Sequence, residues 1–181
     1  AVSAVTTTGY TTTSYAQWSG LGILVLVVLM SVGGATASTA GGLKQFRVFL
    51  LFKSVIWDLK RRVLPRNAVV CHTVTLSSSG RTEVTTDDLV QVANFVFLYL
   101  GTYVIGVALL LLAGCSLRDS AFEFASALAT TGLSVGVTSP TAPPLVLWAE
   151  MAGMFLGRLE FLVVIIGVIR IAVGLRRRLG I

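Results

Sequence analysis

The sequence has few charged residues: Asp, Glu, Lys and Arg make up 12% of its 181 residues, while 55% of the residues are hydrophobic. Soluble domains have about 25% charged and about 45–50% apolar residues, so an ordinary soluble domain is excluded. Apolar runs long enough to cross the roughly 30 Å hydrocarbon core of a bilayer lie at 18–32, 89–113 and 145–173. The first run reaches that length only if residues 33–42 also lie at membrane depth. The sequence therefore predicts an integral membrane protein.

Cysteine and histidine are also scarce, with Cys71, Cys115 and His72 as their only examples. No CxxC pair or His/Cys cluster is present, which argues against a metal or redox centre. In the topology inferred below, the two cysteines lie on opposite sides of the membrane and cannot pair. No signal peptide is visible, Ala1 is not an initiator methionine, and the first residues resemble the end of a helix. We therefore expect the C-terminal part of a longer protein.

Acidic residues are outnumbered by basic ones, and the net charge is +6. Such an excess can indicate nucleic-acid binding in a soluble chain, but here the basic residues follow the predicted spans. They cluster at 53–66 and at 176–178. Because short loops rich in Lys and Arg stay cytoplasmic, we expect both clusters on the cytoplasmic face of a multi-pass protein of the cell (inner) membrane. Anionic lipid, rather than nucleic acid, is the expected partner of these charges.

The residue pattern divides the chain into three segments. Residues 1–67 begin as the end of a helix, pass through a hydroxyl-rich stretch and continue as an apolar helix from Trp18 to about Arg62. Residues 68–85 alternate apolar and polar side chains around the sequence SSSGR, which predicts a short cytoplasmic hairpin. Residues 86–181 form the third segment.

This third segment is predicted to contain two spans with a shorter helix between them. Residues 85–88 resemble a capping box and open an outward span that ends near Gly114. The run 119–129 is too short and too polar at its flanks to cross a bilayer, so we expect a helix that goes half-way. Leu145 then begins a span that returns inward to Arg176.

Two stretches match without gaps at an offset of 123 residues: SAVTTTGY at 3–10 and SALATTGL at 126–133. Five positions are identical, and each stretch precedes an inward span. Internal symmetry of this kind is typical of transport proteins. Extended backbone at membrane depth is tolerated where it lines a cavity, and its carbonyl oxygens can there replace the water shell of a monovalent cation. Neither stretch contains a carboxylate, which disfavours tight divalent-cation binding. Two matched copies favour this interpretation over ordinary interfacial loops.

Ten residues of Gly, Ala, Ser and Thr interrupt the first apolar helix at 33–42, with the sequence GGATASTAGG. Such a break leaves backbone groups that need water or ions as partners. The alternative is close helix packing through small residues, but a run of this length favours a break.

A second unusual feature is Arg158, in the sequence GRLE in the middle of the last span. An arginine there costs at least about 2.5 kcal/mol on insertion scales and must find partners. Glu150 or Glu160 could neutralise it in a purely structural ion pair. Carbonyl groups freed by the break at 33–42 would also suit the five donors of its guanidinium.

These three signatures, in this order, resemble the Trk/Ktr/HKT superfamily of potassium transporters, and most closely its bacterial Trk branch, over essentially all of the chain. The resemblance implies an all-α integral membrane fold of helix–pore-loop–helix repeats, with part of repeat three and all of repeat four present. It implies a potassium-binding filter formed by Thr7, Thr8, Gly9, Tyr10, Thr130, Thr131, Gly132 and Leu133, in which the four threonines are metal ligands. It also implies an intramembrane gate formed by Gly33, Gly34, Ser38, Thr39, Gly41, Gly42 and Arg158. Ala40 stands where the family usually has another glycine.

We therefore expect uptake of a monovalent cation, potassium, through a carbonyl-lined filter gated by the Gly-rich loop, by a symporter or a channel. No enzymatic activity and no organic cofactor are expected. The resemblance also implies a homodimer docked on a cytosolic nucleotide-binding regulatory ring. Two other classes were weighed. A membrane-embedded enzyme would have to use Glu150, Arg158 or Glu160, which lack a His, Cys or Asp partner at useful spacing. A non-conducting scaffold does not explain the two matched stretches.

Overall fold

The computed structural model describes residues 1–15, 17–36, 38–63, 73–76, 80–139 and 141–159, together with 164, 166, 167, 169, 170 and 174. Cys71, His72, Glu160 and the arginines at 176–178 lie outside the described residues, as does most of the predicted last span beyond Leu159. The elements, in chain order, are α1 Val2–Val5, α2 Gly20–Val32, α3 Gln45–Val63, β1 Thr73–Leu76, β2 Gly80–Glu83, α4 Thr86–Leu112, α5 Leu117–Leu128 and α6 Pro144–Leu159.

The first apolar helix is interrupted where the small residues lie. Ser19 caps α2, its hydroxyl accepting a hydrogen bond from the backbone N–H of Gly22 (3.3 Å). The helix ends at Val32, and Gly33 follows with φ +68°. A helix resumes only at Gln45, where α3 begins. Residues 33–44, which join α2 to α3, are called the break.

A two-stranded hairpin and the longest helix follow α3. Strands β1 and β2 pair antiparallel in the segment where alternation predicts a hairpin. The predicted capping box is present at the start of α4, because the backbone N–H of Thr85 donates to Asp88 Oδ2 at 3.0 Å. Among the described residues, α4 is the one helix long and apolar enough to cross a bilayer. Its 27 residues span about 40 Å.

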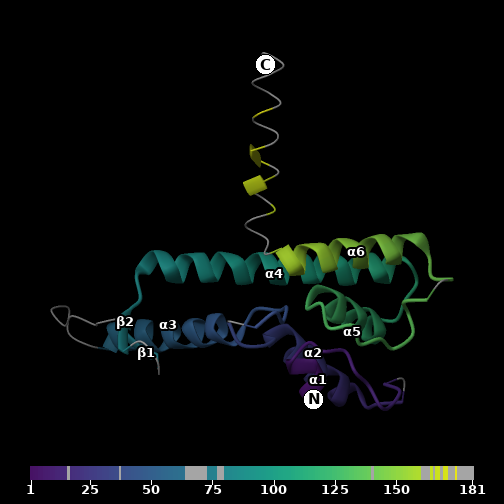
Figure 1. The fold of residues 1–181 in the computed structure, drawn as a ribbon, viewed down its shortest axis with the longest axis horizontal. Coiled ribbons are helices and arrows are strands. Elements are labelled where there is room, and N and C mark those ends of the chain that lie inside the picture. Colours follow the sequence, from purple (N-terminus) through teal and green to yellow (C-terminus); the bar gives the residue numbers. More distant parts are fainter. Residues whose placement is uncertain are drawn as a thin grey trace.

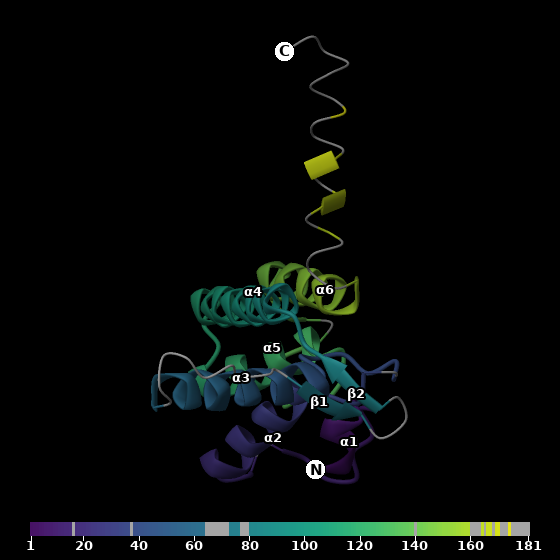
Figure 2. The same ribbon diagram turned by 90° about the vertical axis from the view of Figure 1, so that its left-hand side faces the viewer.

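Helix α5 lies at the centre of the described helices and packs against α2, α4 and α6. Figures 1 and 2 show α4 and α6 side by side in one layer, with α3 and α5 beneath them and α1 and α2 beyond α5. The Phe124 ring is buried where α5 meets two glycines: a Cβ at Gly106 would overlap the ring, and one at Gly153 would lie 3.0 Å from it. Tyr103 adds a hydrogen bond from its hydroxyl to the carbonyl of Ala121 (3.0 Å). This close packing sets the position of α5, and therefore where the chain leaves its C-terminus.

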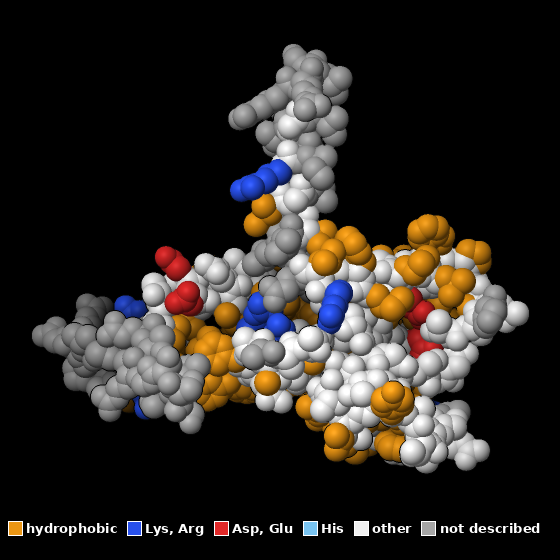
Figure 3. All heavy atoms as spheres, viewed as in Figure 1, with side chains coloured by type: hydrophobic (Ala, Val, Ile, Leu, Met, Phe, Trp, Pro, Cys, Tyr) orange, Lys and Arg blue, Asp and Glu red, His pale blue; other side chains and the backbone are white. Residues whose placement is uncertain are grey.

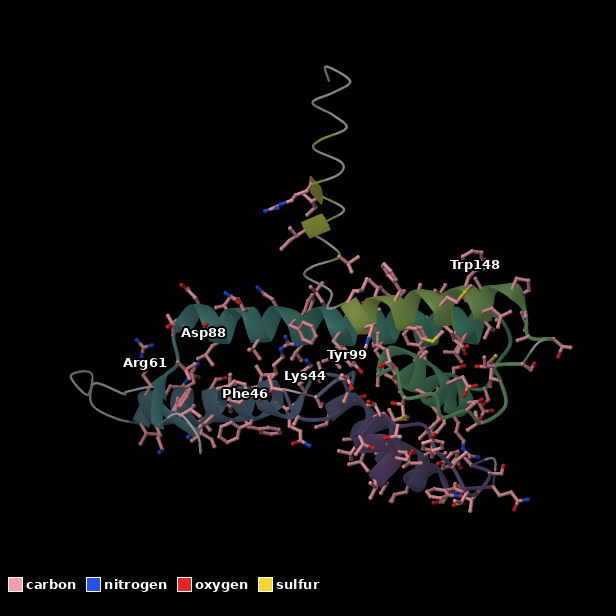
Figure 4. The ribbon with its side chains drawn as sticks, in the orientation of Figure 1. Lys44, Phe46, Arg61, Asp88, Tyr99 and Trp148 are labelled. Carbon is pink, nitrogen blue, oxygen red and sulfur yellow. The ribbon has the colours of Figure 1, made fainter. Side chains whose placement is uncertain are left out.

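Many large hydrophobic side chains are exposed on the described part of the chain. Phe97 and Leu112 on α4 are 78% and 79% exposed, and Trp148 on α6 is 70% exposed. Figure 3 shows hydrophobic side chains over the outer side of α6, and Trp148 projects away from the other helices in Figure 4. Such an extent of apolar surface indicates contact with lipid or with further protein rather than with water.

Candidate functional site

The helices that precede the two Thr-Thr-Gly stretches end in the same backbone conformation. The C-cap of α1 is Thr6, with φ −78° and ψ −5°, and the C-cap of α5 is Ala129, with φ −79° and ψ −1°. The next residue has a positive φ in both copies: +50° at Thr7 and +53° at Thr130. Glycine usually occupies this position after a helix. A β-branched residue there is an outlier, and such strain concentrates at functional sites.

The matching positions also form matching hydrogen bonds. The backbone N–H of Thr8 donates to the Ser3 carbonyl at 3.1 Å, and that of Thr131 donates to the Ser126 carbonyl at 2.9 Å. These bonds turn the chain out of each helix in the same direction. The internal repeat seen in the sequence is therefore a repeat of backbone geometry as well.

The two stretches also lie against each other. Gly9 and Gly132 have φ values of +79° and +85°, which glycine adopts without strain. A Cβ at Gly9 would overlap the carbonyl oxygen of Thr131. The backbone of the first stretch therefore contacts the backbone of the second, although 123 residues separate matching positions.

The side chains of the two stretches differ more than their backbones do. Tyr10 is 82% exposed, whereas its counterpart Leu133 is 3% exposed. The Thr8 hydroxyl lies 2.7 Å from that of Thr6. Thr131 is buried, and its hydroxyl has no hydrogen-bond partner within the described part of the chain. A buried hydroxyl without a partner costs free energy, so the Thr131 oxygen is suited to coordinating a cation.

A pocket of about 480 Å³ opens beside the second stretch. Residues 130–134 line one side of it, and Glu123, Glu150 and Arg158 also reach it. The pocket therefore runs along the chain from the second stretch toward the middle of α6.

The break folds back on itself through its glycines. A Cβ at Gly33 would overlap the carbonyl oxygen of Gly41, and the backbone N–H of Leu43 donates to the Ser31 carbonyl at 2.8 Å. The break also abuts the end of α5, because a Cβ at Gly41 would overlap the carbonyl oxygen of Ala129 and lie 2.6 Å from Thr130 Oγ1. The small residues thus allow backbone to sit directly against the start of the second stretch.

Arg158 contacts the break. Its Nη1 donates to the carbonyl oxygen of Thr39 at 2.5 Å. Gly157 makes this possible, since a Cβ there would overlap the carbonyl oxygen of Leu128 and hold α6 away from α5. The sequence suggests Glu150, Glu160 or carbonyl groups of the break as partners of Arg158. Among the described residues, Arg158 bonds to a break carbonyl, that of Thr39, while Glu160 lies outside the described residues.

A second pocket, of about 290 Å³, lies against the break and shares Arg158 with the first pocket. Arg158, Lys44 and Arg47 line it together with break residues 38–42. Lys44 has φ +65°, and its Nζ lies 3.4 Å from the Thr36 carbonyl oxygen that accepts its hydrogen bond. Lys and Arg side chains gather near the middle of the face seen in Figure 3, and Figure 4 shows Lys44 between α3 and α4.

The structure therefore brings together most of the predicted residues. The two stretches meet at Gly9 and Thr131, and the break meets both Thr130 and Arg158. The side chain of Ser38 instead bonds locally, its hydroxyl donating to the Ala35 carbonyl at 2.7 Å. Sequence reasoning missed Lys44 and Glu123. The available signals were a lysine two residues after a Gly-Gly pair and an acid inside the otherwise uncharged sequence AFEFASAL.

Comparisons with known proteins find relatives among cation transport proteins. The family model described as TrkH, cation transport protein, matches residues 1–172. The chain is 34% identical over 165 residues to the Trk system potassium uptake protein TrkH of Escherichia coli, covering 88% of this chain and 32% of that protein. It is 33% identical over 173 residues to the Trk system potassium uptake protein TrkI of Halomonas elongata, and the match covers 91% of this chain and 34% of that protein. An uncharacterized cation transporter of Methanocaldococcus jannaschii is 29% identical over 167 residues, again covering 91% of this chain and 34% of that protein.

The fold has a counterpart among solved structures. The crystal structure of the potassium transporter TrkH from Vibrio parahaemolyticus superposes with a TM-score of 0.73 at 27% identity, covering 90% of this chain and 34% of that one. The chain spans about a third of the length of the relatives that it matches. Its mostly helical architecture corresponds to part of an all-α membrane transporter. Because the family model matches nearly the whole sequence, the chain belongs to the TrkH family of cation transport proteins.

Proposed function

We propose that this chain forms part of a potassium-uptake pathway, with the two Thr-Thr-Gly stretches as filter strands and the break with Arg158 as the gate. In this proposal residues 1–67 supply the end of a third pore loop, its filter strand and a broken inward helix. Residues 68–85 supply a cytoplasmic hairpin, and residues 86–181 supply a fourth helix–pore-loop–helix repeat. The observation that carries the proposal is the repeated backbone geometry at Thr7 and Thr130.

Several features of the two stretches support potassium as the ion. Adjacent strands with positive φ at Gly9 and Gly132 can turn successive carbonyl oxygens toward a common axis. The buried Thr131 hydroxyl offers a further oxygen. The filter residues include no carboxylate, so a bound ion is held weakly enough to leave. The four threonines are therefore proposed as potassium ligands within the filter.

The position of the break supports a gate. Its backbone sits against Thr130 at the start of the second stretch, and Arg158 donates a hydrogen bond to it at Thr39. A guanidinium beside this end of the stretch also places a fixed positive charge in the path of a cation, which raises the energy of passage. Obstruction and repulsion act at the same point.

Flux in proteoliposomes tests the proposed function. A full-length transporter that carries this sequence is reconstituted, and uptake of potassium is measured against sodium and choline. We expect potassium uptake well above that of choline and above that of protein-free vesicles. An enzyme or a non-conducting scaffold predicts no uptake above protein-free vesicles, and that result would contradict the proposal.

The cytoplasmic face carries a second part of the proposal. The last turn of α3 contains Lys60, Arg61 and Arg62, and short basic segments stay cytoplasmic. We propose that this basic end, in a homodimeric multi-pass protein of the cell membrane, contributes to docking of a cytosolic nucleotide-binding ring.

Co-purification tests the docking. Detergent-solubilised full-length transporter is expected to elute with such a ring at low salt and to lose it when Arg61 and Arg62 are both replaced by Glu. Replacing the exposed pair Asp87 and Asp88 on α4 by Asn serves as the control and should preserve co-elution. A ring retained equally by both double variants would remove these arginines from the docking surface.

A further inference from the structure

Glu123 is a buried acid that the filter and gate assignments leave without a role. It lies on α5 and is 2% exposed, among buried apolar neighbours that include Phe122 and Phe124. A carboxyl group is retained in such surroundings only when hydrogen bonds satisfy its oxygens. The identity of its partners therefore indicates what this side chain does.

Within the part of the chain that the structure describes, every hydrogen bond that Glu123 accepts comes from the residues directly after the second stretch. Its Oε1 accepts from Ser134 Oγ (2.5 Å), from the backbone N–H of Thr138 (2.9 Å) and from Thr138 Oγ1 (2.8 Å). Its Oε2 accepts from the backbone N–H of Val135 (3.0 Å). Residues 134–138 are called the exit limb. One carboxylate thus gathers donors from three residues of the limb.

Helix α5 holds the second stretch at both ends. At its start, the backbone N–H groups of Thr130 and Thr131 donate to carbonyls of the last turn of α5, at 3.0 and 2.9 Å. At its end, Glu123 holds the exit limb. Between these attachments lie residues 131–133, whose carbonyls belong to the proposed filter. The exit limb follows residue 133 directly in the chain, so its position constrains where these carbonyls lie.

Thr138 extends the contact to α6. Its hydroxyl lies 2.9 and 2.8 Å from the two carboxyl oxygens of Glu150. A hydroxyl has one proton, so it can satisfy both acids only if one acid donates to it. Glu123 accepts hydrogen bonds from two backbone N–H groups, which can only donate, so Glu123 is the acceptor. We therefore assign Glu150 as the acid that donates a proton to the Thr138 hydroxyl. A neutral amide at position 150 can make that same donation.

We propose that Glu123 is a positioning residue of the filter, holding the exit limb so that the carbonyls of the second stretch stay aligned on the ion path. This inference rests on the proposed function, because it assumes that the second stretch is a filter strand. It assigns selectivity to a side chain that does not touch the ion.

Glu123→Gln is the decisive substitution. It preserves the size of the side chain but replaces one acceptor oxygen by an NH2 donor. Both oxygens of Glu123 face donors, so neither orientation of the amide fits. We expect the potassium-to-sodium flux ratio of the reconstituted full-length transporter to fall about fivefold or more, which corresponds to about 1 kcal/mol of discrimination.

Two matched acid-to-amide changes serve as controls. Asp119→Asn alters a partly exposed acid on the same helix, away from the exit limb, and should leave the ratio unchanged. Glu150→Gln keeps a neutral side chain and a donor for Thr138 in the same pocket, so it should change the ratio much less than Glu123→Gln. A ratio lowered equally by the position-150 change would mean that any change to this pair of acids, and not the loss of acceptors for the exit limb, is responsible, and would overturn the inference.

A milder variant covers the case in which Glu123→Gln fails to fold. Ser134→Ala combined with Thr138→Val removes the side-chain donors and preserves the backbone ones, so a smaller shift in the same direction is expected. All ratios are compared on equal amounts of monodisperse protein. If Gly9→Ala lowers the ratio while the Glu123 and limb variants do not, the inference fails and the filter stands. If none of them changes the ratio, the filter assignment fails as well.

Discussion

Arg158→Ala is expected to increase cation flux through the full-length transporter about tenfold or more at equal amounts of folded protein. The substitution removes the charge-assisted hydrogen bond to the Thr39 carbonyl, and bonds of this kind contribute about 1.5–3 kcal/mol. It also removes a positive charge from the two pockets that Arg158 lines. Both losses favour passage, the first by releasing the obstruction and the second by lowering the electrostatic barrier.

Companion variants separate these two contributions. Arg158→Lys retains the charge but not the guanidinium geometry, so flux between wild type and Arg158→Ala is expected. Deleting residues 36–40 should raise flux sharply, and adding Arg158→Ala to the deletion should raise it little further, because residues in contact act non-additively. Arg62→Ala, at an exposed ion pair with Asp58, is the control and should leave flux unchanged. Additive gains, or a loss of flux with intact folding, would exclude the coupled gate.

Gly9→Ala is expected to lower the potassium-to-sodium flux ratio more than Gly132→Ala does. Both glycines have positive φ, a conformation that costs other residues about 1–2 kcal/mol. Only at Gly9 does an added Cβ also overlap a backbone atom, the carbonyl oxygen of Thr131, whereas nothing lies within 4 Å of the same atom at Gly132. The alanine at position 9 therefore displaces a proposed ion ligand of the other strand directly.

Ion-flux ratios from matched proteoliposomes test this order of effects. Gly114→Ala is the control, because Gly114 has φ +92° with nothing within 4 Å of an added Cβ and lies outside both stretches. It should lower thermal stability by a similar amount to Gly132→Ala and leave the flux ratio unchanged. Equal ratios in wild type, Gly9→Ala and Gly132→Ala would remove both stretches from the filter.

Much of the helical architecture could be predicted from local patterns. The capping residues Thr85 and Asp88 identify the start of α4 within a residue, and the small residues at 33–42 identify where the first apolar helix stops. The half-way helix, expected at 119–129, runs from Leu117 to Leu128. Capping, hydropathy and helix breaking depend on neighbours in the sequence, which is why one sequence is sufficient for them.

The contacts of the site could be predicted only in part. The offset of 123 residues identified the matched stretches, but not the positive φ at Thr7 and Thr130, because threonine avoids that conformation in local statistics. The exit-limb contacts of Glu123 depend on a turn whose shape no local rule specifies. Gly157 could be read as an ordinary small residue of a span, since its importance comes from the Leu128 carbonyl, far away in the chain.

The composition of the break has a thermodynamic consequence. Residues 33–42 contain no side chain larger than threonine, and their closest approaches are between backbone atoms. Withdrawing this segment from the end of α5 therefore exposes little apolar area, and hydrophobic free energy scales with that area. The heat-capacity change of opening should accordingly be small, since it arises mainly from newly hydrated apolar surface. With so small a heat-capacity change, the closing free energy of the proposed gate should vary linearly with temperature, whereas that of an element that must take apart a packed core follows a curve.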